Sequence, residues 1–202
     1  MKRFFTNLVL FMSMSIAFSS FTACTNNTTS PSNVSVDGNN KTSAETKNNN
    51  YPPAPSAIMQ AELKDLDGNT FKLEDKKGKV VLVNLWAIWC GPCVAEMPEF
   101  AKMQDEYRDK GFEVIGLNTG TQDGEEEPAE NIKSFIEKRK INYKIGYGTD
   151  EIFDEFDKKT RIGGIPQSMV INREGQMTYI VGGGGPRAVG QIREAVEKAI
   201  NE

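Results

Sequence analysis

The feature that most constrains the fold is an apolar run over residues 79–86 that leads into two closely spaced cysteines. The run is short, rich in β-branched side chains and nearly continuous in hydrophobicity, which is typical of a central strand covered on both faces. A helix is predicted over residues 92–110, because apolar residues recur there at helical spacing and Gly111 follows as a stop signal. Cys90 and Cys93 therefore lie between a buried strand and the first turn of a helix.

Beyond residue 56 the chain alternates between patterns typical of strands and patterns typical of helices. Turn residues between short apolar runs also predict a small hairpin near the start of this region and a second hairpin near its end. The predicted elements are a hairpin at 61–73, strands at 112–117 and 143–147, helices at 128–140 and 150–158, a hairpin at 168–181 and a last helix at 186–200. This order predicts an α/β sandwich built on a mixed sheet.

The N-terminal residues have the layout of an export signal. Lys2 and Arg3 precede a largely apolar stretch at residues 8–18, and small residues lead up to Cys24. The apolar stretch is shorter than the roughly 20 residues that span a bilayer. Cys24 stands where the lipobox of bacterial lipoproteins places its acylated cysteine, and this resemblance implies a signal over residues 1–23 and a lipid anchor at Cys24. Ordinary signal cleavage or an uncleaved anchor are the alternatives.

The next segment, residues 24–55, is predicted to be a flexible polar linker. It consists mostly of Asn, Ser and Thr up to residue 50 and ends in a proline-rich stretch. So few apolar side chains cannot offset the entropy lost on ordering the chain. We therefore assign residues 56–202 to the folded domain, which is long enough for one substantial core.

Composition excludes several classes of function. The chain has 24 Lys and Arg against 28 Asp and Glu, a net charge of −4, so no basic field attracts nucleic acid. It has no histidine, which removes Ser/His/Asp triads and His-ligated metal sites. The acidic run at residues 125–127 is interpreted as a solvated loop, with steering of a partner as the alternative. The four glycines at 182–185 are interpreted as a permissive turn, since no phosphate-binding signature follows them.

The pair Cys90 and Cys93 carries the strongest chemical signal. Two thiols at this spacing can form a disulfide, and the start of a helix presents unpaired N–H groups and partial positive charge to the first sulfur. We expect the pKa of Cys90 to lie below that of a free thiol, which makes Cys90 the nucleophile and Cys93 the resolving thiol. Pro92 suits the first helical turn, and Gly91 leaves the nucleophile uncrowded.

Two other interpretations of the cysteine pair are weaker. A structural zinc site needs about four ligands, and the chain offers no histidine and only Cys24 as a further thiol, so no metal is expected. An inert disulfide would close a ring too small to restrict the unfolded chain appreciably. Redox function is therefore favoured, with the Cys90–Cys93 disulfide as the redox group and no other cofactor.

The residues around the cysteines resemble a known family. Residues 83–93, Pro98 and the sequence at 164–166 before a predicted strand resemble the thioredoxin fold. The continuation after Cys93, the export signal and the inserted strand and helix look like the TlpA/ResA-like thiol-disulfide oxidoreductases. The resemblance spans residues 56–201 and implies a three-layer sandwich with an N-terminal hairpin and a central strand–helix insertion.

The resemblance also implies roles for individual residues. Pro166 matches the family's cis-proline, and the backbone of Ile165 can pair with an extended substrate, with Trp89, Gly91 and Pro92 completing the binding surface. Glu96 matches a glutamate near the dithiol that can carry the proton of Cys93. A solvated carboxylate that only favours the helix N-terminus is the alternative for this residue. Asn84 departs from thioredoxins, many of which have a buried aspartate at that position.

We therefore expect an extracytoplasmic, membrane-tethered protein-disulfide reductase, acting as a monomer. Its partners would be exported disulfide-containing proteins, apocytochrome c among them, and a membrane thiol carrier as electron donor. A peroxiredoxin-like enzyme is the first alternative, although Trp89 precedes a vicinal cysteine pair rather than a solitary cysteine. A lipoprotein that uses the fold only to bind partners is the second.

Overall fold

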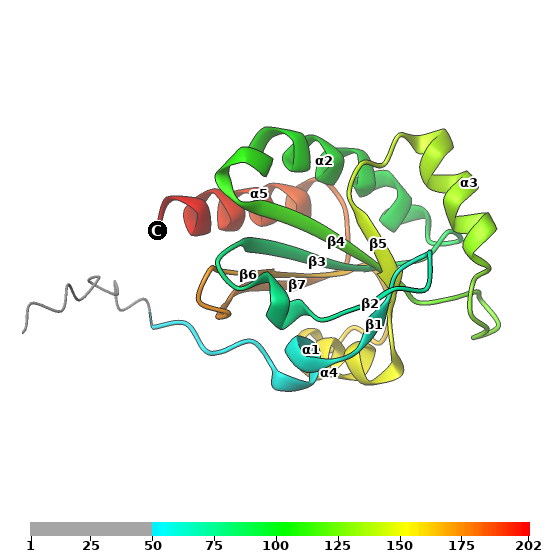
Figure 1. Cartoon of the computed structure of the whole chain (residues 1–202), viewed down its shortest axis with the longest axis horizontal. Coiled ribbons are helices and arrows are strands. Elements are labelled where there is room, and N and C mark those ends of the chain that lie inside the picture. Colours follow the sequence, from blue (N-terminus) through cyan, green and yellow to red (C-terminus); the bar gives the residue numbers. More distant parts are fainter. Residues whose placement is uncertain (1–49) are drawn as a thin grey trace, which may run out of the picture. The chain divides into compact units, whose positions relative to one another are not determined.

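The computed structural model describes residues 50–202, which form a five-stranded mixed sheet with helices on both faces (Figure 1). The strand order is β5–β4–β3–β6–β7. The central strand β3 (Val80–Trp86) pairs in parallel with β4 (Phe112–Asn118) and antiparallel with β6 (Gln167–Ile171). At the edges, β5 (Lys144–Tyr147) is parallel to β4, and β7 (Met177–Gly182) is antiparallel to β6. The mixed sheet predicted from the sequence is confirmed.

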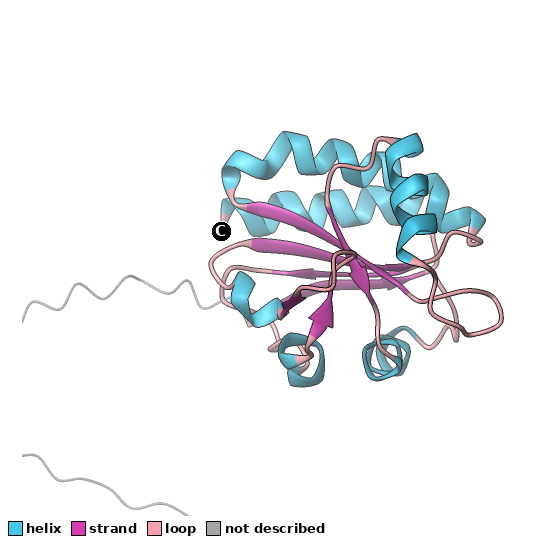
Figure 2. Cartoon of the chain, turned by 45° about the vertical axis from the view of Figure 1, so that its right-hand side comes forward, coloured by secondary structure: helices cyan, strands magenta, loops and turns pink. Residues whose placement is uncertain are grey.

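Helices form the outer layers of this sandwich (Figure 2). On one face lie α2 (Gly91–Tyr107), α3 (Ala129–Arg139) and α5 (Pro186–Asn201). The other face is covered by α1 (Ser56–Gln60) and α4 (Asp150–Thr160). The three-layer arrangement implied by the resemblance is therefore confirmed, as are the helices predicted from apolar spacing.

The central strand β3 is buried along its whole length, with all seven of its residues shielded from solvent. Successive side chains of a strand point to opposite faces, so β3 contributes to both cores. Val80, Leu82 and Trp86 pack with α2 and α5, whereas Val81, Val83 and Leu85 pack with α1 and α4. Each such side chain contributes roughly 1.5–3 kcal/mol by burial. This burial holds the segment that follows β3 in a fixed place.

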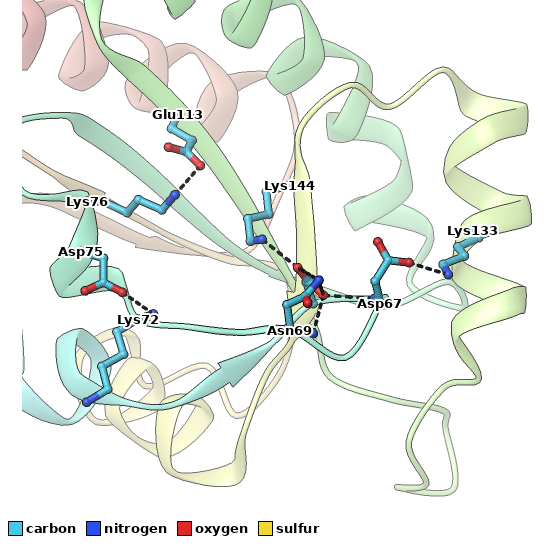
Figure 3. Close-up of polar contacts among 9 residues, drawn as sticks. Asp67, Asn69, Lys72, Asp75, Lys76, Glu113, Lys133 and Lys144 are labelled. Carbon is cyan, nitrogen blue, oxygen red and sulfur yellow. Dashed lines mark hydrogen bonds and ion pairs between the residues drawn. The ribbon is translucent and has the colours of Figure 1, made fainter.

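The small hairpin precedes β3 and is shorter than predicted. It pairs β1 (Leu63–Lys64) with β2 (Thr70–Phe71) and is followed by the short helix η1 (Leu73–Lys76). Ion pairs attach its turn to the rest of the domain (Figure 3). Lys144 Nζ donates to Asp65 Oδ2 at 3.1 Å, and Lys133 Nζ donates to Asp67 Oδ1 at 2.8 Å.

Residues 52–54, which the sequence assigned to the end of the linker, form backbone hydrogen bonds with the turn between β6 and β7. Met177 N donates to Pro52 O at 2.9 Å, and Ala54 N donates to Gly175 O at 3.0 Å. These bonds attach residues 52–54 to the β6–β7 turn.

The remaining N-terminal assignments, namely the signal over residues 1–23, the acylated Cys24 and most of the linker, lie outside the described residues. Among the helices of residues 50–202, none has the length and apolar character that a membrane span requires.

The helix α1, which sequence analysis missed, supplies a test of the fold. Ile58 is fully buried between this helix and α4. Ile58→Ala should lower the free energy of unfolding by about 2–5 kcal/mol, because it removes packed atoms and leaves a cavity. Urea denaturation measures the loss. Gln60→Ala on the exposed side of the same helix should change stability by less than about 0.5 kcal/mol; equal effects of the two variants would contradict the packing of α1.

Candidate active site

Cys90 and Cys93 form a disulfide at the N-terminus of α2. Their Cα atoms are 5.3 Å apart. Cys90 is the N-cap of the helix and its Sγ accepts a hydrogen bond from Cys93 N at 3.2 Å. Cys90 keeps 4% of its surface exposed, and Cys93 keeps 0%. Cys90 is therefore the cysteine that a second molecule can reach.

The start of α2 also sets the electrostatics of this sulfur. The first N–H groups of a helix have no partner within the helix, and they carry the positive end of its dipole. Gly91 opens the helix and Pro92 occupies its first turn, and both residues are exposed. A thiolate at position 90 is favoured in the reduced protein, since anionic sulfur accepts the N–H of Cys93 better than a thiol does.

Pro166 lies near the first turn of α2, because Gly184 approaches both Pro166 and Pro92. The Ile165–Pro166 peptide bond is cis, which is the geometry that the resemblance implied. Gly183 N donates to Pro166 O at 2.8 Å, and this bond attaches the glycine loop after β7 to the proline. A Cβ at Gly184 would lie 3.0 Å from Pro166 Cγ and 3.0 Å from Glu96 Oε2. The loop that contains the four glycines at 182–185 therefore belongs to the site, whereas its sequence predicts only a turn.

Glu96 lies close to Gly184 of this loop and is 3% exposed. Its Oε1 accepts a hydrogen bond from Asn84 Nδ2 at 3.2 Å, and Asn84 Nδ2 also donates to Ser168 Oγ at 3.0 Å. Its Oε2 is buried and has no hydrogen-bond partner among the described residues. A solvated carboxylate, the alternative considered from the sequence, does not describe this side chain.

Burial raises the pKa of Glu96 to about 7, although the hydrogen bond from Asn84 lowers it. Desolvation disfavours the charged carboxylate, and a single amide donor compensates only part of that cost. Glu96 lies three residues after Cys93 on the same helix, a spacing that places two side chains on one helical face. A group with this pKa can accept and release a proton near neutral pH.

The two tryptophans near the site have different environments. Trp86 is fully buried and its ring stacks on Phe135 with centroids 5.5 Å apart. Trp89 is 45% exposed beside the disulfide. Its Nε1 donates to Gly120 O at 3.0 Å, which connects the site to the loop after β4. Sequence analysis missed Gly120 and Ser168, and neither residue belongs to a motif that would have indicated them.

The site lies at the edge of the sheet where the carboxyl ends of several strands meet. In open α/β sheets this edge is where ligands bind. Within the part of the chain that the structure describes, no three potential metal-ligating side chains lie close enough together to hold an ion.

Comparison with known proteins identifies the family. Residues 54–180 match the AhpC/TSA family. The chain belongs to the AhpC/TSA family. Among curated relatives of this domain is thiol-disulfide oxidoreductase ResA of Bacillus subtilis (strain 168), 30% identical over 131 residues that cover 64% of this chain and 65% of the relative. ResA of Geobacillus thermodenitrificans is 30% identical over 122 residues, covering 60% of this chain and 64% of the relative. The matches thus span less than two thirds of these relatives' length.

Solved structures agree with the fold of this AhpC/TSA domain. A thiol:disulfide interchange protein of the thioredoxin family from Chlorobium tepidum TLS is 29% identical with a TM-score of 0.60, over 74% of this chain and 97% of that one. A thiol:disulfide interchange protein from Bacteroides sp. is 27% identical with a TM-score of 0.58, over 75% and 90% of the two chains. The fold is thioredoxin-like, as the sequence resemblance implied.

The buried carboxylate predicts a pH dependence of stability. The pKa of Glu96 is about 7 in the folded protein against 4.5 for a solvated glutamate, so the folded state binds more protons between these values. The free energy of unfolding therefore falls as the pH rises through this window, by about 3 kcal/mol in total. Urea denaturation of oxidised Glu96→Gln should show a flatter profile from pH 4.5 to 7.

A matched control is available on the same helix. Glu99 is only half-buried and pairs with Lys102 at 2.6 Å, so Glu99→Gln should retain the wild-type slope. If the profiles of Glu96→Gln and wild type coincide, Glu96 is not the group that titrates.

Proposed function

We propose that this protein is a thiol-disulfide oxidoreductase whose redox group is the Cys90–Cys93 disulfide, with no other cofactor. The observation that carries the proposal is the disulfide at a helix N-terminus, where Cys90 is more accessible than Cys93. Relatives named thiol-disulfide oxidoreductase ResA support it.

The exchange proceeds in two displacements. In the reduced protein the Cys90 thiolate attacks one sulfur of a substrate disulfide, and the other substrate sulfur leaves as a thiolate. A mixed disulfide now joins Cys90 to the substrate. Cys93 then loses its proton and attacks the Cys90 sulfur, which releases the substrate as a dithiol and forms the Cys90–Cys93 disulfide. Two electrons pass from the protein to the substrate.

Glu96 has the properties needed for the second displacement. Cys93 is fully buried, so its proton needs an acceptor within the protein. Glu96 accepts that proton in its charged form and is buried one helical turn further on. Asn84 cannot accept a proton, but its hydrogen bond fixes the orientation of the Glu96 carboxylate.

The direction proposed is reduction of the substrate. A Gly-Pro pair between the cysteines resembles that of reducing members, whose potentials lie near about −270 mV, rather than that of strong oxidants near about −120 mV. Exported disulfide-containing proteins are the substrate class, and apocytochrome c is the specific candidate. A membrane thiol carrier would return electrons to the protein.

The proposed location is extracytoplasmic, with the domain acting as a monomer on a lipid anchor. The support is the sequence of residues 1–24, which combines a basic start, a short apolar stretch and a cysteine at the lipobox position. The polar linker that follows would separate the catalytic domain from the bilayer.

The two cysteines should behave differently when replaced. Cys90→Ser should abolish insulin-disulfide reduction, because it removes the attacking sulfur. Cys93→Ser should also lose turnover, but it should accumulate covalent adducts with substrate proteins, since nothing resolves the mixed disulfide. Non-reducing gels and mass spectrometry detect these adducts and identify the substrates.

The same assays separate the competing functions. Rapid alkylation of Cys90 at neutral pH is expected in the reduced wild type. Negligible insulin reduction by wild type, equal to that of Cys90→Ser, would favour a binding protein without redox activity. Direct turnover of hydroperoxide by the purified protein would instead favour a peroxiredoxin-like enzyme.

The lipid anchor has its own test. In a bacterial host grown with radiolabelled palmitate, the wild-type chain should carry label into the membrane fraction, and Cys24→Ala should carry none. A Cys93→Ala variant serves as a thiol control and should be labelled like wild type. Equal labelling of the wild type and Cys24→Ala would exclude acylation at Cys24.

A further inference from the structure

Two adjoining pockets lie on the Trp89 side of the disulfide. The apolar pocket, of about 310 Å³, is lined by Trp89, Phe153 and Ile165. The acidic pocket, of about 160 Å³, is lined by Glu125 and Glu126 among others. Thr119, Gly148 and Asp150 line both pockets, so the two form one continuous groove that includes Trp89, the residue before Cys90.

The charge along this groove has a single sign. Its ionisable carboxylates come from Glu125, Glu126 and Asp150, and no lysine or arginine lines either pocket. Within residues 50–202, none of these three carboxylates forms an ion pair. Burial raises the pKa of Tyr147, which also lines the acidic pocket, and the charge of Glu126 raises it further. Lys133 lowers the same pKa, but no basic side chain lines the groove itself.

The loop that carries Glu125 and Glu126 is held in place by hydrogen bonds. Gly120 N donates to Asn118 Oδ1 at 2.9 Å, and Thr121 N donates to Glu125 O at 2.8 Å. Because Trp89 Nε1 donates to Gly120 O, the neighbour of Cys90 is bonded to the same loop. These bonds therefore fix the backbone of the loop that carries the acidic side chains relative to Trp89, the neighbour of Cys90.

A buried donor without a partner also points to a ligand at this place. Asn118 lines the acidic pocket and is only 1% exposed, and its Nδ2 has no hydrogen-bond partner among the described residues. An unpaired buried amide N–H costs about 1–3 kcal/mol. A peptide carbonyl, or a water bound to one, is an acceptor that can satisfy it.

We propose that this groove selects polypeptide substrates in which a large apolar residue and then a lysine or arginine flank the reactive cysteine. The inference rests on the proposed function and specifies its substrate class. The apolar side chain would occupy the pocket of Trp89, Phe153 and Ile165. The basic side chain would lie between Glu125, Glu126 and Asp150, while a backbone carbonyl accepts from Asn118. Opposite charge across the groove accelerates encounter and excludes acidic segments.

Synthetic peptides test this selection. Three peptides of one sequence, each with an internal disulfide, carry Lys, Gln or Glu at the flanking positions, and their rates are normalised to reduction by dithiothreitol. At low salt the reduced wild type should show kcat/KM about tenfold higher for the Lys peptide than for the Glu peptide. The ratio should fall towards one in 0.5 M NaCl, because salt screens exposed charges.

The double variant Glu125→Gln/Glu126→Gln should lose most of this preference, measured as the ratio of kcat/KM for the Lys and Glu peptides. Asp109→Asn, which removes one charge just beyond the C-terminal end of α2, should keep the tenfold ratio. Equal kcat/KM for the Lys and Glu peptides in wild type would overturn the inference and leave the proposed function intact.

Binding provides a readout that does not depend on redox activity. The Lys peptide with both cysteines replaced by serine should bind wild type in fluorescence anisotropy and should bind the double variant at least about fivefold more weakly. If binding follows this pattern but no peptide is reduced, the groove is supported and the oxidoreductase function fails. Binding that is indifferent to the double substitution would overturn the groove.

Discussion

Burial of β3 on both faces is the constraint from which the geometry of the site follows. All seven of its residues are buried, and a slip of one position would move every side chain to the opposite core. The strand therefore ends at a fixed place, and only three residues separate Trp86 from the N-cap of α2. The reactive sulfur is positioned by a strand and a helix rather than by a long loop. Side chains on such elements are held in place more precisely than side chains on loops.

The register between β3 and β6 then brings the second half of the site to the first. Leu85 is opposite Gln167 and Asn84 is opposite Ser168, so Pro166 emerges beside the end of β3, where the cysteines follow. The same pairing places the Asn84 amide between Ser168 and Glu96. The register between β3 and β6 thus sets both the position of Pro166 and the polar contacts that orient the Glu96 carboxylate.

Sequence patterns predicted the elements in which apolar residues recur at a regular spacing. The apolar run of β3, the helical spacing of α2 and the turn after residue 172 depend on local periodicity, and the structure agrees with them to within a few residues. The helix α1 has only five residues, too few to show a period. The role of Pro52 and Ala54 depends on an edge of the sheet more than 100 residues later in the chain, which no local pattern indicates.

The environment of Glu96 shows why the chemistry of the site was harder to predict than its location. The carboxylate is buried by three separate segments: its own helix, Asn84 from β3 and Gly184 from the loop before α5. None of these indicates burial when taken alone, since a glutamate near a helix start is usually solvated and a glycine run usually marks a turn. A Cβ at Gly184 would lie 3.0 Å from both Glu96 Oε2 and Pro166 Cγ, which is closer than ordinary van der Waals contact. Gly184 thus lets the loop lie close to the carboxylate, and burial of the group raises the pKa of Glu96 to about 7, the range where it can exchange protons.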